Sequence, residues 1–451
     1  MDKSNIPPPR AWLFPALCLG AIASAQPLDL ARALRIADEK AFGNRLASAR
    51  EQSSSGQKLS AWAGFVPAVR LEAGALVTDD PLGAFGTRLG QRRVSMASFD
   101  PASLNDPSAI ASLSTSVIAE VPLLNVDAWH GMVATDRNLQ AARRAVDLER
   151  QRVRAQVVEA WFGVGLARAA VVAWDTGLAV ARSYERQAMS GQRNETATRS
   201  DVLRSRVEVA SIGASLAKAR TDVVLAEKRL AMLLGGGVLP GDVPLIDLTD
   251  SVLVRQSRNG MATGPALELE VVGLQADAAK AAWCRTRDAF LPRLNGMARV
   301  DWKEHASMFQ KDPSWSVGIV ASWNVLGGAQ ALGSEREARG RWREAETGRE
   351  ALRSQQALER DSERAKLSAS LERLDIERGS LEQVSESHRI VSRRYDEGLA
   401  TIAERIEAGA LETKIRLEMV ALRQEAVTSL AKLALLEGRD PSDLISLSIK
   451  N

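Results

Sequence analysis

The chain has 451 residues, which is enough for two or three ordinary domains or for one elongated architecture. Charged residues make up 25% of the sequence and nearly cancel to a formal net charge of +3, which argues against a nucleic-acid binder. The three histidines and two cysteines have no spacing typical of a metal site, so we expect no metal and no cofactor.

Residues 1–25 are typical of a secretory signal peptide. Lys3 and Arg10 supply a basic start, and the apolar stretch AWLFPALCLGAIA is too short to span a bilayer. The triplet Ala-Ser-Ala at 23–25 fits the small-x-small rule for cleavage. Gln26 is then expected to be the first residue of the mature chain.

Cys18 offers lipidation as an alternative to cleavage after residue 25, although Leu17 precedes it where a lipidation motif has a small residue. Removal of the signal leaves Cys284 as the remaining cysteine, so we expect no disulfide within the chain. No later segment is expected to supply the roughly 18 apolar residues of a membrane helix.

The first half of the mature chain, residues 26–235, is predicted to hold a helix, two strands and a helical hairpin. The strands are expected at about 66–78 and 112–124, because apolar and polar residues alternate there with period two. Prolines are absent between Pro122 and Pro240, which indicates a very long helical region. We predict a hairpin over about 127–234, with its tip in SGQRNETATRSD.

The second half, residues 265–438, repeats this order after an equatorial linker at 236–264, and a tail at 439–451 follows it. A helix is followed by strands at about 291–302 and 315–326 and by a hairpin at about 328–437. Apolar residues at 3-4 spacing mark both arms of this hairpin, and Tyr395 and His388 share the seam. After the tip, the heptad seam is expected at Leu399, Ala403, Ile406, Ala410, Thr413, Leu417, Val420, Gln424, Val427, Ala431 and Ala434.

Four strands of membrane length cannot close a barrel, and an open sheet edge cannot lie in lipid. Alternation alone is weak, because the edge of a globular sheet alternates too. If the strands are membranous, other copies of the chain must complete the barrel, and three copies give twelve strands. The sequence therefore favours a homo-oligomer.

The ordered, duplicated motifs resemble the TolC-type outer membrane efflux proteins over nearly the whole mature chain. LDLARALRIADEKAFGNRLASAREQSSSGQKLSAWAGFVPAV is similar to the family's first helix and strand, and VIAEVPLLN and GIVASWNVLGG are similar to its strand-to-helix transitions. RSDVLRSRVEVA and YDEGLATIAERIEA resemble its two hairpin tips.

The resemblance implies a mainly α fold with membrane β-strands, assembled as a homotrimer. Twelve strands would form an outer-membrane barrel and twelve helices a periplasmic tunnel, joined on the outside by loops at about 79–111 and 303–314. An α/β equatorial collar would take residues 235–265 and the tail. Periplasmic adaptor proteins and inner-membrane pumps would be the partners, outer-membrane lipid would surround the barrel, and the cargo would be drugs, metals or secreted polypeptides.

The resemblance also implies an acidic periplasmic aperture at the hairpin tips. The family's acid positions fall on Asp201, Glu404 and Glu407, and Ala400 stands where a basic latch residue can occur. Acids after a helix break also complement the helix dipole, so helix capping is the alternative role. Carboxylates crowded in a narrow throat would create a strong negative potential that binds cations.

Other tip residues have two interpretations each. The glycines are expected in turns or at close helix approaches, and a solvated surface is the alternative to adaptor docking for the arginines. The tip and docking candidates are Gly191, Arg193, Arg199, Arg394, Gly398 and Leu399. His388 is expected to make a core or inter-helix hydrogen bond, and Tyr395 to pack. Trp302, Trp315 and Trp323 fit a membrane aromatic girdle or ordinary strand packing.

Two other classes of protein are possible in principle. An enzyme finds no support, because the sequence has no Gly-x-Ser-x-Gly, phosphate loop or His-Glu-x-x-His motif. A periplasmic coiled-coil adaptor or tether without a membrane barrel is the alternative function, but it lacks two duplicated hairpins with two pairs of alternating strands. The prediction is an outer-membrane exit duct with a large periplasmic portion.

Overall fold

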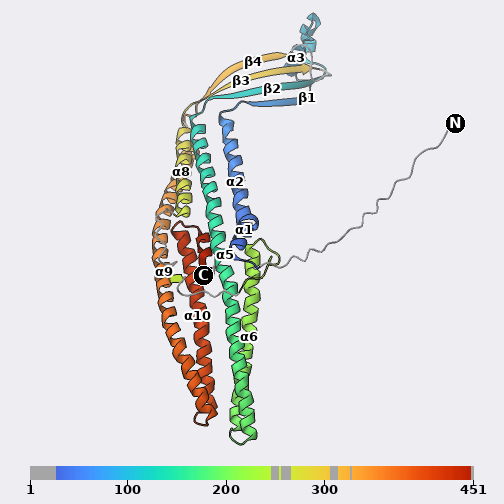
Figure 1. The fold of residues 1–451 in the computed structure, drawn as a ribbon. Helices are drawn as coiled ribbons and strands as arrows, with labels where there is room; N and C mark the ends of the chain where they lie inside the picture. Colours follow the sequence, from blue (N-terminus) through green and yellow to red (C-terminus); the bar gives the residue numbers. More distant parts are fainter. Residues whose placement is uncertain (1–26, 245–252, 255–265, 305–312, 326–327, 448–451) are drawn as a thin grey trace, which may run out of the picture.

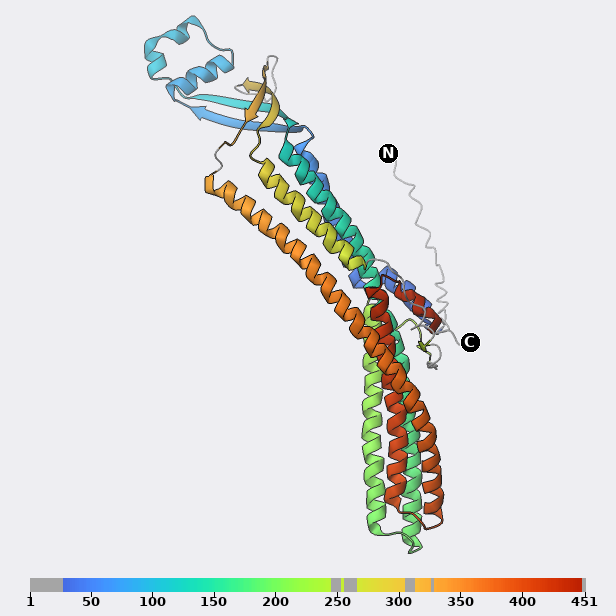
Figure 2. The same cartoon turned by 90° about the vertical axis from the view of Figure 1, so that its left-hand side faces the viewer.

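A computed structural model describes residues 27–244, 253–254, 266–304, 313–325 and 328–447. The expected signal peptide, Cys18, most of the equatorial linker and His305 lie outside these ranges. The described part is an elongated bundle of helices with a small sheet at one end (Figure 1). Figure 2 shows the same molecule from the side, with the strands turned away from the direction of the helices.

Two long helical hairpins form the body of the molecule. The first joins α5 (Val126–Arg193) to α6 (Arg199–Leu233), and the second joins α9 (Gly328–Asp396) to α10 (Ile402–Leu436). At 68 and 69 residues, α5 and α9 are each about 100 Å long. Both hairpins lie where the proline-free stretches predict them, with tips within the expected segments; the division into repeats at 235 and 265 remains an interpretation.

Shorter helices complete the columns of the bundle. After a short helix α1 (Leu30–Lys40), α2 (Phe42–Ala61) lies above α6, and α8 (Leu267–Asp288) lies above α10 (Figure 1). Helix α5 packs against α2, α6, α8 and α10, whereas α9 packs against α8 and α10. The protomer is thus a row of four helical columns: α2 with α6, then α5, then α8 with α10, then α9.

The sheet has the order β1-β2-β3-β4 and is antiparallel throughout. Its strands are β1 (Ala68–Thr78), β2 (Ile110–Leu124), β3 (Arg293–Glu304) and β4 (Ser314–Ser322). The one pairing within each half, β1 with β2 and β3 with β4, is the pairing that the alternation predicts. The pairing of β2 with β3 joins the halves, and no local pattern in the sequence indicates it.

The connection between β1 and β2 is folded, where the sequence interpretation placed only a loop. It contains α3 (Pro81–Gly90), a 3-10 helix η2 (Met96–Phe99) and α4 (Pro101–Asn105). Asp80 caps α3 by accepting a hydrogen bond from Gly83 N at 2.6 Å, and Asp100 accepts one from Ala102 N at 3.4 Å in α4. Each aspartate precedes a proline, a pair typical of helix starts that the sequence reasoning missed.

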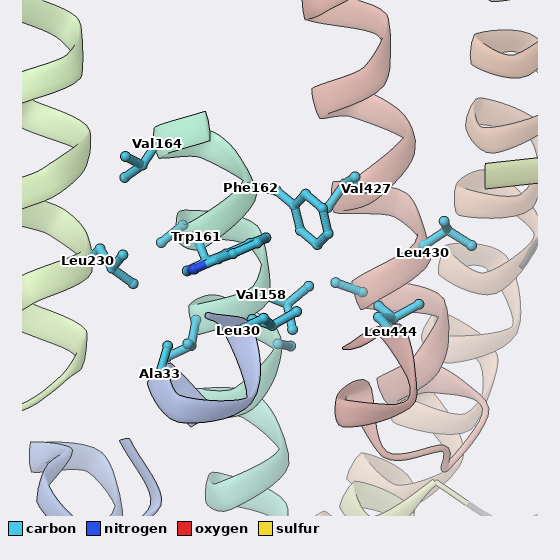
Figure 3. Close-up of a cluster of buried hydrophobic side chains, with 14 of the residues drawn as sticks. Leu30, Ala33, Val158, Trp161, Phe162, Val164, Leu230, Val427, Leu430 and Leu444 are labelled. Carbon is cyan, nitrogen blue, oxygen red and sulfur yellow. The ribbon is translucent and has the colours of Figure 1, made fainter. Parts of the chain in front are cut away.

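The main hydrophobic core lies at the equator of the bundle, where both hairpins and α1 meet (Figure 3). Trp161 and Phe162 of α5 are buried there against Leu30, Leu430 and Leu444. Trp161 Nε1 donates to Leu28 O at 2.8 Å, which satisfies the buried indole. The ends of the chain are therefore held against the middle of α5.

Salt bridges at the same level fix α5 to its neighbours. Arg154 donates two hydrogen bonds to the Asp38 carboxylate, at 3.0 and 2.7 Å, and also forms a salt bridge with Asp440. Asp38 and Asp440 lie near the two chain ends, so one guanidinium ties both to the hairpin body. Planar two-point contact of this kind suits arginine and a carboxylate.

The predicted seam of α10 is displaced. The residues buried deepest in its first half are Ile402, Arg405, Ile415, Met419 and Leu422, while the predicted positions in that half are half-buried or exposed. The reason is that α10 contacts α9 on one side and α5 on the other, so two of its faces are covered. The heptads mark the face toward α5, as the contact of Thr413 with Gly177 illustrates.

One sequence expectation about membrane helices was wrong. An 18-residue window within α5 reaches a mean hydropathy of 1.4, enough by length and composition for a membrane span, with 44% of the window buried inside the protein. This stretch supplies the equatorial core, which accounts for its apolar character. Cys284 is a free thiol among the described residues.

Candidate functional site

The register of the four strands gives the sheet one polar face. Ser116 of β2 lies opposite Glu72 of β1 and Asp301 of β3, and most other residues of that face are polar. The apolar exceptions are Leu76, Ile118, Met297 and Val320. The face holds Arg70, Glu72, Ser112, Ser114, Ser116, Glu120, Arg299, Asp301, Lys303, Ser314 and Ser316. Polar residues from both halves of the chain therefore share one surface.

The charges on this face are paired with one another. Arg70 donates to Glu120 Oε1 at 2.7 Å, across β1 and β2. Arg299 Nε contacts both oxygens of Asp301, at 2.8 and 2.9 Å, and Ser116 Oγ donates to the same carboxylate at 2.6 Å. Water reaches much of this face, since Arg70 and Glu120 are exposed. The arrangement suits the wall of an aqueous pore, where opposite charges leave no strong net field.

The opposite face of the sheet is apolar and uncovered. Val317 and Trp315 of β4 have exposed fractions of 72% and 75%. The apolar set on this face comprises Val69, Leu71, Ala73, Ala75, Val77, Leu113, Val117, Ala119, Val300, Trp302, Trp315, Val317, Ile319 and Ala321. A continuous exposed apolar band of strand length is typical of a lipid-facing barrel wall.

Trp315 and Trp323 are exposed, so packing within the chain does not account for them. Trp323 Nε1 donates to Phe290 O at 2.9 Å, at the end of the sheet nearest the helices. An indole with its ring outward and its N–H satisfied fits the interface of a bilayer. The aromatic girdle remains a prediction.

The open edges of the sheet coincide with the open edges of the helical row. Strand β1 continues from α2, and β4 leads toward α9, so one side of the protomer is α6, α2 and β1, and the other is α9 and β4 (Figure 1). Both sides expose large apolar residues, among them Leu59 and Val207 on the first and Leu332 and Leu358 on the second. Each side of the protomer therefore has an unpaired edge strand and uncovered apolar side chains on its helices.

Both hairpin tips are closed by the same device, a capping box. Thr198 Oγ1 accepts from Asp201 N at 3.2 Å, and Asp201 Oδ2 accepts from Thr198 N at 2.9 Å. At the second tip Thr401 Oγ1 accepts from Glu404 N at 3.2 Å, and Glu404 Oε1 accepts from Thr401 N at 3.4 Å. The signal Thr-x-x-acid was present in the sequence at both places.

Two of the three predicted aperture acids thus have a local structural role. Asp201 and Glu404 satisfy the free N–H groups that begin α6 and α10, which is the capping alternative that the sequence leaves open. Glu407 is exposed one turn further along α10 and takes no part in the cap. Whether any of the three lines an aperture stays a prediction.

The tip glycines differ from each other. Gly398 has φ +73° and reverses the chain after α9, as predicted for a turn glycine. Gly191 is helical, and the left-handed residue of the first tip is Glu195 with φ +65°. A Cβ on Gly191 would lie 2.9 Å from Ala197 Cβ, so this glycine allows close packing of the loop, not the turn itself.

The remaining docking candidates are on the surface. Leu399 is 63% exposed, and Arg193 and Arg199 are exposed in the tip region of the first hairpin. Arg394 donates to Leu399 O at 3.1 Å and so closes its own turn. Docking of an adaptor here stays a prediction.

Sequence reasoning missed Arg405, which is buried near the tips where both hairpins meet. Its side chain is 8% exposed, and its guanidinium lies 4.3 Å from the ring centre of Tyr184 and 5.0 Å from that of Tyr395. Nη1 donates to Gln187 Oε1 and, at 3.2 Å, to Asp396 Oδ1. Tyr184 and Gln187 belong to α5, so Arg405 joins the two hairpins. Arg405 lies between the predicted seam positions Ala403 and Ile406, so the heptad pattern gave no signal for it.

A hydrogen-bonded chain close to Arg405 adds a second link between the hairpins. Tyr184 of α5 shares a hydrogen bond with His388 Nε2 of α9, and His388 Nδ1 lies 2.6 Å from Glu412 Oε2 of α10. This confirms the expected inter-helix role of His388. Burial alone would raise the pKa of Glu412, but hydrogen bonds from Arg416, His388 and Ser385 outweigh it and hold that pKa below its usual value.

The combination of a four-stranded sheet with one exposed apolar face and two long helical hairpins defines the fold class of this chain. The comparisons agree. Residues 262–439 match the family model described as outer membrane efflux protein. This part of the chain is similar to the outer membrane efflux protein family.

Solved structures share the fold over almost the whole chain. VceC from Vibrio cholerae has 17% identity and a TM-score of 0.75, covering 91% of this chain and 96% of that one. The Campylobacter jejuni outer membrane channel CmeC has 13% identity and a TM-score of 0.75, covering 98% and 97%. The Neisseria gonorrhoeae channel MtrE has 16% identity and a TM-score of 0.72, covering 92% and 90%. A comparison with the curated proteins finds no match to the sequence.

Proposed function

We propose that three copies of this chain form an outer-membrane exit duct for small molecules such as drugs and other toxic compounds. The observation that carries the proposal is the sheet: one exposed apolar face, one charge-paired polar face and two open edges. An isolated sheet of this kind is stable neither in water nor in lipid. Closure by further copies satisfies the edges and places the apolar face against lipid.

The size of the assembly follows from strand geometry. Twelve strands spaced by about 4.8 Å and tilted by about 40° give a barrel with a radius of about 12 Å. The polar face then lines a water-filled lumen. The four helical columns of each copy add up to a twelve-column tunnel below it, joined along the edges formed by α9 and by α2 with α6.

The tips are the proposed narrow end of the tunnel and its docking surface. Glu407 is the acid free to face the lumen, and Asp201 and Glu404 contribute negative charge from their capping positions. A periplasmic adaptor would meet Gly191, Arg193, Arg199, Arg394, Gly398 and Leu399 and connect the duct to an inner-membrane pump. The word efflux in the family description favours small molecules over secreted polypeptides as cargo.

A soluble adaptor or tether is the competing function, and one pair of variants separates it from the duct. Val317→Lys places a charge on the apolar face, at a cost of about 2–4 kcal/mol per copy near the bilayer midplane. Gly318→Lys, one residue on, points to the polar face, where a new side chain meets open space.

We expect the parent and Gly318→Lys to fractionate with the outer membrane, to migrate as trimers after gentle solubilisation and to conduct in planar bilayers. Val317→Lys should fail to assemble. A soluble parent monomer, or equal behaviour of the two variants, would refute the duct.

A further inference from the structure

The segment between β1 and β2, residues 79–109, is a folded unit, which we name the insert. Phe85 of α3 packs edge-on against Phe99 at a ring-centre distance of 5.8 Å, and Ala84 is buried beneath them. Each helix of the insert starts with its own side-chain cap. Gln91 Nε2 donates to Ala111 O at 2.9 Å and anchors the unit to β2. The insert therefore has a defined shape at the end of the sheet farthest from the helices (Figures 1 and 2).

The insert exposes apolar side chains that its own small core does not need. Leu82 is 81% exposed and Met96 is 89% exposed, and Leu89 and Phe99 are exposed as well. Four large apolar side chains uncovered within one short segment indicate a contact surface. The proposed lipid-facing band of the sheet lies elsewhere, on strands and not on the insert.

The contacts of the insert place it on the pore side of the sheet. Gly90 of α3 lies so close to the side chain of Lys303 that a Cβ on this glycine would be only 3.0 Å from Lys303 Cδ, and Gly83 approaches the side chain of Thr78. Lys303 and Thr78 both belong to the polar face, because Lys303 lies in register with Ser114 and Thr78 continues the row of Arg70 and Glu72. In a closed barrel that face lines the lumen. In such a barrel the insert would therefore lie over the lumen, at the outer end of the barrel.

The radius of the barrel and the length of α3 indicate what each insert contacts. The distance from the barrel wall to its axis, about 12 Å, is shorter than α3, whose ten residues span about 15 Å. Three such units that lean inward cannot avoid one another. We propose, on the basis of the duct described above, that the apolar side of each insert docks on the insert of the next copy and narrows the outer mouth of the barrel.

The charge of the insert is compatible with this contact. It carries three arginines, Arg88, Arg92 and Arg93, against four aspartates, Asp79, Asp80, Asp100 and Asp106. Because each insert carries charges of both signs, two inserts repel each other less than two surfaces of a single charge sign would. Around a threefold axis, unlike patches of neighbouring copies face each other, so arginines can meet aspartates.

Cross-linking tests the docking directly. In a Cys284→Ser background, Met96→Cys treated with a short bismaleimide should give covalent dimers and trimers on denaturing gels. Val317→Cys is the matched exposed control, because the three copies of that position lie about 20 Å apart on the outside of a twelve-stranded barrel. Trimers that do not cross-link through Met96→Cys, or protection of that cysteine by lipid in place of a protein contact, would overturn the docking.

Labelling from outside the cell tests the narrowing. Ser316→Cys lies on the polar face of β4 and is exposed in the protomer. A maleimide on a bulky polyethylene glycol chain, added to intact cells, should label it at least about tenfold faster when residues 79–109 are replaced by an Asn-Gly turn. Equal rates in trimers with and without the insert would overturn the proposal and leave the duct intact. Labelling only after the outer membrane is broken, with no trimer formed, would instead refute the duct.

Discussion

Replacing Arg405 by methionine tests whether the tips are held together by one buried cation. Arg405 stacks between Tyr184 and Tyr395 and bonds to Gln187 and Asp396, so it links α10 to both α5 and α9. Methionine keeps much of the apolar contact and removes the charge and the donors. The side chain is nearly excluded from water, so the loss is not replaced by hydration of the same contacts.

The magnitude can be worked from these contacts. Two cation–π contacts contribute about 1 kcal/mol each, and two hydrogen bonds to exposed partners contribute about 0.5–1 kcal/mol each. Arg405 Nε is buried without a hydrogen-bond partner among the described residues. This unpaired donor costs about 1–3 kcal/mol, which offsets part of the stabilisation. The favourable contacts total about 3–4 kcal/mol, so the net contribution is about 0–3 kcal/mol with a midpoint of about 1.5 kcal/mol, and the separated tips should become about tenfold more populated.

Hydrogen exchange of the native protein measures that population. We expect amides near Tyr184 and in the first turns of α10 to lose about 1.5 kcal/mol of protection in Arg405→Met, while the equatorial core around Trp161 is unchanged. Arg393→Met, at an exposed position of α9, is the control and should leave protection unchanged. Equal protection of the tips in both variants would refute a holding role for Arg405.

Two further predictions concern acids near the tips. Glu407→Ala should raise the conductance or weaken its block by divalent cations without changing tip stability. Glu404→Ala should instead destabilise the start of α10 by about 1 kcal/mol, because it removes part of the cap. Unchanged conductance and unchanged block in Glu407→Ala would show that Glu407 does not line the aperture. The pKa of Glu412 lies below its usual 4.5, so its network stabilises the tips at higher pH and is lost as the pH falls through that lowered value. Hydrogen exchange between about pH 6 and about pH 3 should show that loss in the parent and not in Glu412→Gln, and a parallel response of the two would contradict it.

The features that sequence periodicity encodes were predictable, and those that depend on tertiary contacts were not. Alternation placed the four strands, and missing prolines placed the hairpins. The pairing of β2 with β3 links residues such as Val117 and Val300, whose separation in the chain leaves no local signal. The burial of α10 was displaced because that helix packs on two neighbours, and a single heptad pattern describes only one contact.

The candidate site shows the same division at the level of single residues. The Thr-x-x-acid pattern at 198–201 and 401–404 is a local signal with a local cause, and it was available in the sequence. Arg405 carries no such signal, because its role depends on Tyr184, which lies more than two hundred residues earlier on the other hairpin. The role of a charged residue on a helix is ambiguous until its partner is known, since most arginines are exposed to solvent.

The number of strands in each copy constrains how copies can join. With four antiparallel strands, β1 and β4 run in opposite directions, so β4 of one copy meets β1 of the next as a further antiparallel pair, and any number of copies can continue the ladder. Two copies would give eight strands, whose interior is just filled by side chains. The polar face carries Arg70, Arg299 and Lys303, long charged groups that need hydration. Three copies are therefore the smallest ring that closes both edges and keeps those charges in water.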